Sequence, residues 1–365
     1  MIYISLPVHT QPGAILSQLR NFAHFFPEAM VVLHVSAEAR FTLDHLTAAI
    51  KAGNHCNALV NPRRAPTAWG NILQAHLTNI AFIRNRRDAS RICLHASNDM
   101  LVRPGVQRYL AGGHNFCNRR IVQPGTRWRF GAAALADLEL AKLRHKLGNI
   151  DVIGSQIEGS AYEADVMFAV AELIENTAQQ RPSLPYPREE VWFSTLAHGL
   201  QAHVDGKPYV FSELHRFDRV FWQVQKRLDR LTGTGGAASM LLRRCVEYGM
   251  IKTGFHRIDR RWVDRIARDD TRFLSRYQTL DDGNNIWQVF ERHGLFGVKR
   301  VPRRVDAGLR RYIESLGEAT ASEGRCDRRD TCVAGLMGQQ NLRCPTRCRS
   351  QSRGAVTGRI VLAET

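Results

Sequence analysis

The 365-residue sequence has no long apolar segment and no leader pattern. No window approaches the roughly 18 consecutive apolar residues that a membrane-spanning helix needs. Residues 1–8 lack a basic leader, and His9 and Pro12 interrupt the apolar run, so we interpret this stretch as a buried first strand. These absences predict a cytoplasmic protein, with peripheral association at the inner face of a membrane left open.

Patterns typical of metal and phosphate sites are also scarce. The four tail cysteines have five, eleven and three residues between them, without the paired two-residue spacing of most zinc sites; they are Cys326, Cys332, Cys344 and Cys348. The other four, Cys56, Cys93, Cys117 and Cys245, are scattered singly and are expected to be reduced core thiols. The Gly-rich run at 232–236 lacks the Gly-Lys-Ser/Thr ending of a P-loop and predicts a connection.

Positive charge is abundant. Lysine and arginine number 51 against 34 acidic residues, a formal net charge of +17. This balance favours an anionic partner, which charge alone leaves open between nucleic acid, anionic lipid and a nucleotide diphosphate. Arginine pairs such as Arg303-Arg304 and Arg310-Arg311 are more typical of solvated helix faces than of a binding stripe.

The first 200 residues alternate β-rich runs with amphipathic stretches. Strands are predicted at 2–7, 30–35, 58–61 and 91–95, and helices at 14–26, 42–52, 70–83, 135–147, 164–175 and from about 189. This alternation predicts an α/β fold with a mainly parallel sheet flanked by helices. We expect a core at 1–205, a helical basic part at 206–316, and a disordered tail at 317–365, where apolar periodicity ends.

Four short segments carry the functional signal. The first is His-Thr-Gln-Pro at 9–12 after a strand, followed by a second strand that ends His-Val-Ser at 34–36. The second is Ala-Trp-Gly at 68–70, followed by a strand that ends Ser-Asn-Asp at 97–99.

The remaining segments lie close together in the sequence. Gly-Ser-Ala-Tyr occupies 159–162, and Tyr-Pro-Arg-Glu-Glu-Val-Trp-Phe-Ser-Thr-Leu occupies 186–196. Two carboxylates, Glu189 and Glu190, therefore stand in the first turn of a predicted helix.

In this order, the segments resemble the core-2/I-branching β-1,6-N-acetylglucosaminyltransferases and the related peptide O-xylosyltransferases, over roughly residues 1–290. The resemblance implies a GT-A-like fold and an inverting transfer of a sugar, GlcNAc or xylose, from a UDP-sugar to a saccharide or glycolipid hydroxyl. It implies no cofactor, and a divalent metal is possible but not expected. Without the family's secretory anchor and disulfides, the chain resembles a bacterial-type member that builds surface polysaccharide or glycolipid.

The resemblance also assigns residues. Alignment on Thr195-Leu196 makes Glu190 the general base, which would take the proton of the attacking hydroxyl. The donor-side residues are His9, His34, Ser36, Asp99, Arg276 and Lys252, where Ser36 replaces the family's usual aspartate and Arg276 its lysine. The acceptor-side residues are Gly159, Ser160, Tyr162 and Glu189.

Simpler roles remain open for several of these residues. A lone histidine at a strand end is often only hydrogen-bonded, and Asn98-Asp99 also fits a turn or helix cap. Glu189 and Glu190 would complement a helix N-terminus whatever the function.

Two rival functions also remain. One is a retaining or metal-dependent glycosyltransferase with Asp99 holding Mn²⁺ or Mg²⁺. The other is a basic nucleic-acid-binding protein that uses the arginine-rich C-terminal half, although the sequence has no recognisable nucleic-acid module, so no specific nucleic acid is expected.

Overall fold

The computed structural model describes most of the chain up to Glu323. The described residues are 1–9, 11–67, 70–125, 128, 130–177, 186–233, 236–255, 257–270, 272, 279–281, 286–288 and 293–323. Residues 1–323 belong to one compact unit, which is the one described below.

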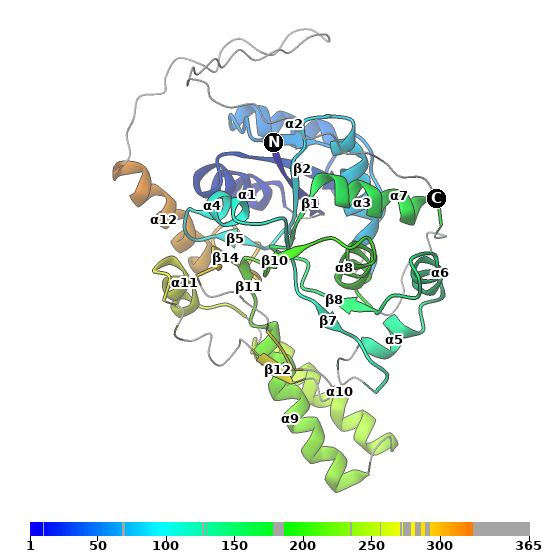
Figure 1. Cartoon of the computed structure of the whole chain (residues 1–365). Helices are drawn as coiled ribbons and strands as arrows, with labels where there is room; N and C mark the ends of the chain where they lie inside the picture. The colour runs from blue at the N-terminus through cyan, green and yellow to red at the C-terminus, as the bar shows by residue number, and fades with distance from the viewer. Residues whose placement is uncertain are drawn as a thin grey trace, which may run out of the picture. The chain divides into compact units, whose positions relative to one another are not determined.

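A mixed sheet forms the centre of this unit (Figure 1). Its strand order is β10-β6-β9-β4-β1-β2-β3. The strands are β1 (Ile2–Val8), β2 (Ala29–Val35), β3 (Ala58–Val60), β4 (Arg91–Leu94), β6 (Asn115–Phe116), β9 (Ala161–Glu163) and β10 (Val204–Gly206). All neighbours pair in parallel except β9, which runs antiparallel to β4 and β6. The predicted mainly parallel α/β architecture is therefore confirmed.

Helices cover both faces of the sheet, as the alternation of side chains along its strands requires. On one face, Ile4, Leu6 and Leu33 pack with apolar residues of α1 (Pro12–Phe25) and α2 (Leu43–Ala52). On the other face, Tyr3, Ile92 and Leu94 pack with α3 (Leu73–Arg84), α7 (Ala164–Glu175) and α8 (Glu189–Gly199).

The boundaries of these elements lie close to those predicted. The helix predicted at 135–147 is α6 (Leu138–Lys146), which begins three residues later and is preceded by a short helix that was not predicted, α5 (Gly131–Leu135). Asp137 divides them because its carboxylate accepts hydrogen bonds from the backbone N–H groups of Glu139 and Leu140, at 3.0 and 3.3 Å, and so caps α6.

A second, three-stranded sheet joins distant parts of the chain. Its order is β11 (Val210–Phe211), β14 (Gly297–Val298) and β5 (Met100–Leu101), with β14 parallel to β11 and antiparallel to β5. It shares an apolar core with α11 (Arg260–Ala267) and α12 (Gly308–Glu323), while α4 (Val106–Ala111) belongs to the core of the main sheet. Helix α12 ends at Glu323, beyond the boundary expected at residue 317.

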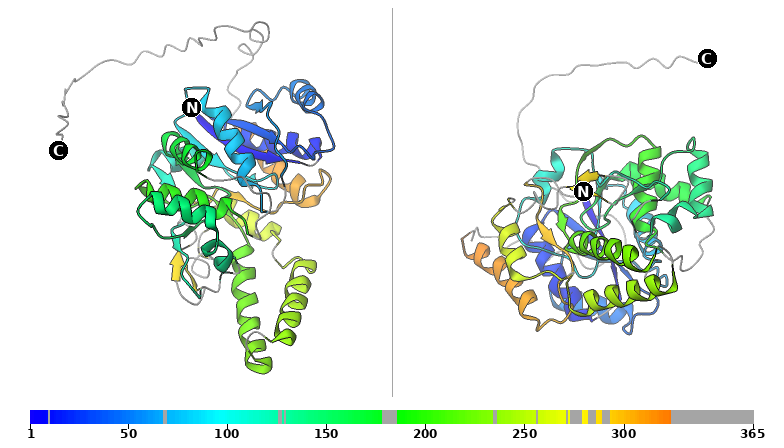
Figure 2. Two further views of the ribbon diagram at one scale, coloured as in Figure 1. Left: turned by 90° about the vertical axis from the view of Figure 1, so that its right-hand side faces the viewer. Right: turned by 90° about the horizontal axis from the view of Figure 1, so that it is seen from below.

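The remaining elements are two short strand pairs and two long helices. The pairs are β7 (Arg120–Ile121) with β8 (Ile153–Gly154), and β12 (Thr279–Asp281) with β13 (Ile286–Gln288). The helices α9 (Leu214–Thr232) and α10 (Ala237–Lys252) lie side by side in both Figure 1 and Figure 2. The connection predicted at 232–236 joins these two helices.

The prediction of four core thiols is half wrong, because Cys93 and Cys117 are buried but Cys56 and Cys245 are exposed. Cys245 lies on α10, and Cys56 lies in the connection between α2 and β3. The tail cysteines lie outside the described residues. Within the described chain, none of the helices combines the length and apolar character needed to span a bilayer.

A buried polar network lies between β1 and α3. Ser5 Oγ and His76 Nδ1 are hydrogen-bonded at 2.9 Å, and Asn79 Nδ2 donates to Ser5 Oγ at 3.1 Å and to the Val32 carbonyl at 2.9 Å. Burial lowers the pKa of His76 to about 3, assisted by repulsion from His34 and His95. Burial likewise lowers the pKa of His34 to about 4. Both rings are therefore neutral in the folded protein at pH 7.

These two histidines should make the protein sensitive to mild acid. In the unfolded chain they titrate near a pKa of about 6.5. Their contribution is complete above that value and is lost as the pH falls toward 4, because the unfolded state then binds more protons than the folded state. Urea unfolding between pH 7 and pH 4.5 should show a shallower loss of stability in His76→Asn than in the wild type. His145→Gln, which changes a surface histidine of α6, is the control, and an unchanged slope in His76→Asn would contradict this account.

Candidate functional site

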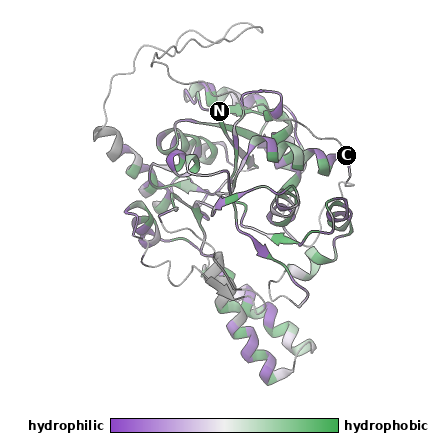
Figure 3. Cartoon of the chain, in the orientation of Figure 1, coloured by the Kyte–Doolittle hydropathy of each residue, from purple (hydrophilic) through white to green (hydrophobic). Residues whose placement is uncertain are grey.

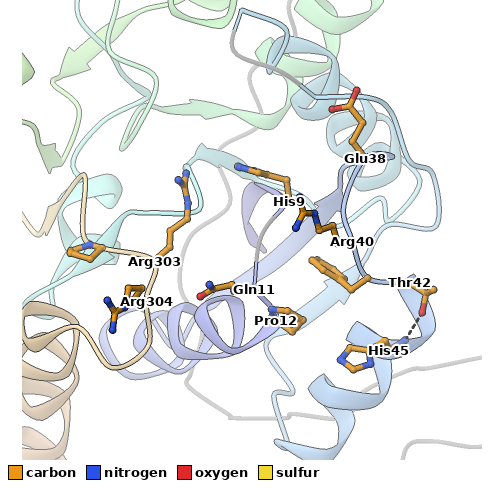
Figure 4. Close-up of a pocket in the computed structure, with 11 residues that line it drawn as sticks. His9, Gln11, Pro12, Glu38, Arg40, Thr42, His45, Arg303 and Arg304 are labelled. Atoms are coloured by element: carbon orange, nitrogen blue, oxygen red, sulfur yellow. Dashed lines mark hydrogen bonds between the residues drawn. The ribbon is translucent and has the colours of Figure 1, made fainter. Parts of the chain in front are cut away.

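A cavity of about 1000 Å³ opens at the carboxyl ends of β1 and β2 (Figure 4). It is lined by residues that follow β1 and begin α1, by residues of the β2–α2 connection and the first turn of α2, and by the segment after β14: His9, Gln11, Pro12, Glu38, Arg40, Phe41, Thr42, His45, Pro302, Arg303 and Arg304. Strand β1 lies between β2 and β4, and the chain passes from β1 to β2 and β3 on one side before it returns to β4 on the other side. Open parallel sheets bind ligands at such topological switch points.

The cavity is rich in positive charge. Three arginines, Arg40, Arg303 and Arg304, line it together with a single carboxylate, Glu38. In Figure 4, Arg303 and Arg304 approach from one side and Arg40 from the other. A cavity lined by several guanidinium groups favours an anionic ligand, because these groups form fork-shaped hydrogen bonds with phosphate.

Among these three arginines, Arg303 is half-buried, whereas Arg40 and Arg304 are exposed. Arg303 Nε donates a 3.1 Å hydrogen bond to Ser97 Oγ, just after β4. Burial lowers the pKa of Arg303, and the nearby Asp99 carboxylate opposes that shift. The pKa of His9 is lowered by burial and by the charge of Arg303, so His9 faces the cavity as a neutral ring. Arg304 is more exposed and bonds to Asp306, with Nη2 and Oδ2 2.6 Å apart.

His34 and Ser36 lie behind the cavity and not in its lining. Both are fully buried. His34 Nε2 accepts a 2.9 Å hydrogen bond from the Ala65 backbone, and Ser36 Oγ accepts from the backbones of Glu38 and Thr67, each at 3.3 Å. These bonds shape the connection that carries Arg40, which is an indirect role for two of the predicted donor residues.

Asp99 is also buried, at the end of the turn that follows β4. Its Oδ2 accepts a 2.8 Å hydrogen bond from the Ala96 backbone and lies 3.3 Å from His95 Nδ1, while His95 Nε2 is 2.7 Å from the Tyr209 hydroxyl. The side chains of His95 and Asp99 have no exposed surface. In this conformation Asp99 organises the turn beneath Ser97.

The Gly-Ser-Ala-Tyr segment joins β4 to the 209–211 segment. The Gly159 N–H donates to the Leu94 carbonyl at 2.9 Å, and the Gly159 carbonyl accepts from the Tyr209 N–H at 3.1 Å. Gly159 has a φ of +79°, and a Cβ there would lie 2.5 Å from the Val210 nitrogen. Ser160 and Tyr162 are buried, with Ser160 Oγ bonded to the Gln156 carbonyl. The motif therefore fixes the carboxyl edge of the sheet.

A buried cluster of hydrogen-bonded side chains around Asp137 positions the N-terminus of α8. Asp137 Oδ2 accepts hydrogen bonds from the Tyr186 hydroxyl and from Trp192 Nε1, the latter at 3.2 Å. The Arg188 guanidinium lies 3.8 Å from the centre of the Trp192 ring. These contacts set the first turn of α8, in which Glu190 is half-buried and Glu189 is buried.

Glu189 belongs to a buried group of charges with Glu158 and Lys299. The Lys299 ammonium forms an ion pair with Glu158 Oε1. Burial raises the pKa of Glu189 to about 7, with repulsion from Glu158 adding to the shift and Lys299 opposing it. Glu189 Oε2 has no hydrogen-bond partner within the part of the chain that the structure describes. A carboxyl group with these properties can exchange a proton near neutral pH.

The sequence also predicts Arg276 and Lys252 as donor-site cations. Arg276 lies outside the described residues. Lys252 ends α10 on the surface, where its ammonium lies 5.3 Å from the centre of the Tyr248 ring, and it does not line the cavity. Within the described residues, no group of three or more His, Cys, Asp or Glu side chains could hold a metal ion.

Sequence reasoning missed the cations that the structure does place in the cavity. The interpretation of Arg303-Arg304 as a solvated helix face is wrong, because the pair precedes α12 and enters the cavity. One feature of the sequence could have indicated them: Lys299, Arg303 and Arg304 follow the apolar run at 295–298, as residues at the end of a strand would. That run pairs with β5 only through tertiary contacts.

Comparisons with known proteins give weak similarities. No protein-family model and no curated protein matches the chain. Among solved structures, it is similar to TarS of S. aureus, with a TM-score of 0.33 and 11% identity over 62% of this chain and 39% of TarS. It is similar to an active-site mutant of LgtC, with a TM-score of 0.38 and 8% identity over 87% and 96% of the two chains.

A further similar structure is the galactosyltransferase LgtC in complex with donor and acceptor sugar analogs, with a TM-score of 0.28 and 10% identity over 55% of this chain and 70% of that one. Scores of this size carry no argument about activity. The functional conclusion therefore depends on the site itself.

Gly159 offers a test of how tightly the carboxyl edge is built. Gly159→Ala should lower the free energy of unfolding by about 3 kcal/mol, because the left-handed backbone is strained and the new Cβ meets the Val210 backbone. Gly148→Ala is the matched control, since Gly148 has a φ of +81° and open space around its Cβ position. The control should lose only about 1 kcal/mol in urea unfolding. Equal losses would show that the 209–211 segment can move away.

Proposed function

We propose that this chain is an inverting glycosyltransferase of GT-A type. It would transfer a sugar from a UDP-sugar, with GlcNAc or xylose as the leading candidates, to a hydroxyl group of a saccharide or glycolipid. The observation that carries the proposal is the arginine-lined cavity at the carboxyl ends of β1 and β2. The order of the four sequence segments supports it independently.

The donor would bind with its diphosphate against Arg303. Cleavage of the bond between the anomeric carbon and the phosphate oxygen leaves an electron pair on the diphosphate. Fixed positive charge stabilises that leaving group. Arg303 is held by Ser97 before any ligand arrives, so its orientation costs little on binding. Arg40 and Arg304 lie on the cavity lining and would add charge without a metal ion. Arg276 stays a prediction for a second contact.

Glu190 would accept the proton of the acceptor hydroxyl as its oxygen attacks the anomeric carbon. The base must reach a bound acceptor, and Glu190 keeps exposed surface at the start of α8, whereas Glu189 is 5% exposed. The raised pKa of Glu189 makes it the competing candidate. The two residues differ by one position and can be compared directly.

Binding of UDP in the presence of a chelator tests the donor site. UDP should raise the thermal midpoint of the wild type in EDTA, since a ligand that binds only the folded state stabilises it. Arg303→Gln should weaken UDP binding by about 10- to 100-fold, the value of a charge-assisted hydrogen bond. Arg311→Gln, on the surface of α12, is the charge-matched control. Binding that requires Mn²⁺ or Mg²⁺ would instead favour a metal-dependent enzyme.

Paired substitutions test the base. Glu190→Gln should lower kcat by about 10²- to 10⁴-fold while UDP affinity changes less than about twofold, because only proton removal is lost. Glu189→Gln, with the same chemical change one residue away, should retain most of the transfer rate. The reverse result, with activity lost only in Glu189→Gln, would assign the base to Glu189.

A further inference from the structure

The two helices α9 and α10 form a basic helical hairpin with a polar tie between them. Ser239 Oγ on α10 and Gln225 Nε2 on α9 both donate to Asp229 Oδ1, each at 2.6 Å. Ser239 and Gln225 are buried. These hydrogen bonds fix how the two helices face each other, and they satisfy the Asp229 carboxylate between the helices.

The hairpin exposes an unusual amount of apolar surface. Six of the eleven large apolar side chains that are exposed in the described chain lie here: Leu231, Met240, Leu241, Leu242, Tyr248 and Ile251. We call these six residues the hairpin surface. Leu231 is 82% exposed and Leu241 is 64% exposed. Large exposed aliphatic groups gathered on one element mark an interaction site.

Helical geometry places much of this surface together. Helix α9 ends at Thr232 and α10 begins at Ala237, so Leu231, Met240 and Leu241 share the end of the hairpin. Tyr248 follows Leu241 by seven residues, two helical turns on the same face. In Figure 3 the hairpin carries green apolar turns beside purple polar ones.

Positive charge surrounds these apolar groups. Residues 220–252 contain six lysines and arginines but only two acidic residues. Lys226, Arg227, Arg230 and Arg244 are exposed, whereas Asp229 and Glu247 are half-buried. The outward charge of the hairpin is therefore strongly positive.

We propose that the hairpin surface docks on an anionic lipid membrane, with Leu231, Met240 and Leu241 entering the acyl boundary and Arg227, Arg230 and Arg244 contacting lipid phosphates. Charge complementarity selects this partner. Exposed leucines close in sequence to exposed cations are typical of segments that lie in a bilayer interface, whereas nucleic-acid sites combine cations with aromatic stacking platforms. The inference does not depend on the proposed enzymatic function.

Vesicle co-sedimentation of the full chain tests the docking. Vesicles of phosphatidylcholine with one third phosphatidylglycerol should bind the protein, and vesicles of phosphatidylcholine alone should bind it at least about tenfold more weakly. Binding should weaken with added salt, since charge in the headgroup layer is screened.

Two sets of variants separate the apolar and charged contributions. The double variant Leu231→Ser with Leu241→Ser should lose at least about tenfold in vesicle affinity. The triple variant Arg227→Gln, Arg230→Gln and Arg244→Gln should lose about 100-fold. Leu138→Ser, at a 75% exposed leucine of α6, and the triple variant Lys51→Gln, Arg63→Gln and Arg108→Gln are the matched controls. Both controls should stay within about twofold of the wild type.

Several outcomes would overturn the docking. They are no binding to the anionic vesicles, unchanged binding of the double leucine variant, or tighter binding to duplex DNA or RNA than to vesicles. A dimer that the leucine variant converts to a monomer, without loss of vesicle binding, would assign the hairpin surface to a second copy of the chain. The substituted side chains are exposed, so thermal midpoints should match the wild type and confirm that the variants fold.

Discussion

The pairing of β14 between β5 and β11 is the contact on which the site depends. A two-residue strand from the late part of the chain bonds to one strand from the first third and to another from the middle. A Cβ on Gly297 would lie 2.9 Å from the Met100 carbonyl oxygen, so only glycine allows so close an approach. Beyond β14 the chain then passes the carboxyl edge of the main sheet. Its cations, Lys299 and Arg303, therefore lie one after the other along that edge.

The order of the cations after β14 gives the two parts of the site different chemical surroundings. Lys299 neutralises Glu158 and moderates the buried Glu189, whereas Arg303, four residues later, turns to Ser97 and the cavity. One short segment thus supplies a cation to the buried Glu158 and Glu189 carboxyl groups and a cation to the cavity. The main sheet supplies the frame, because its parallel strands end beside one another at the same edge.

The sequence predicted this frame well and the site only in part. Apolar alternation located β1, β2 and β4, and the Glu189-Glu190 pair correctly marked the start of α8. The same reasoning could not show that Ser36 and Asp99 are buried in turns or that Arg303 lines the cavity, because those outcomes depend on contacts between residues far apart in sequence. Short strands such as β6, β9 and β14 have two or three residues and no periodicity to detect.

The late return of the chain has a consequence for biosynthesis. The hydrogen bonds from Arg303 to Ser97 and from Arg310 to Ser17 span 206 and 293 residues. At ribosomal rates of about 5–20 residues per second, the partners of the second bond emerge tens of seconds apart. A nascent chain would complete the main sheet once β10 has emerged, and the carboxyl edge of that sheet would stay uncovered until the segment with Arg303 and Arg310 is made. Protection of that edge by a chaperone during translation would therefore favour a high yield of native protein.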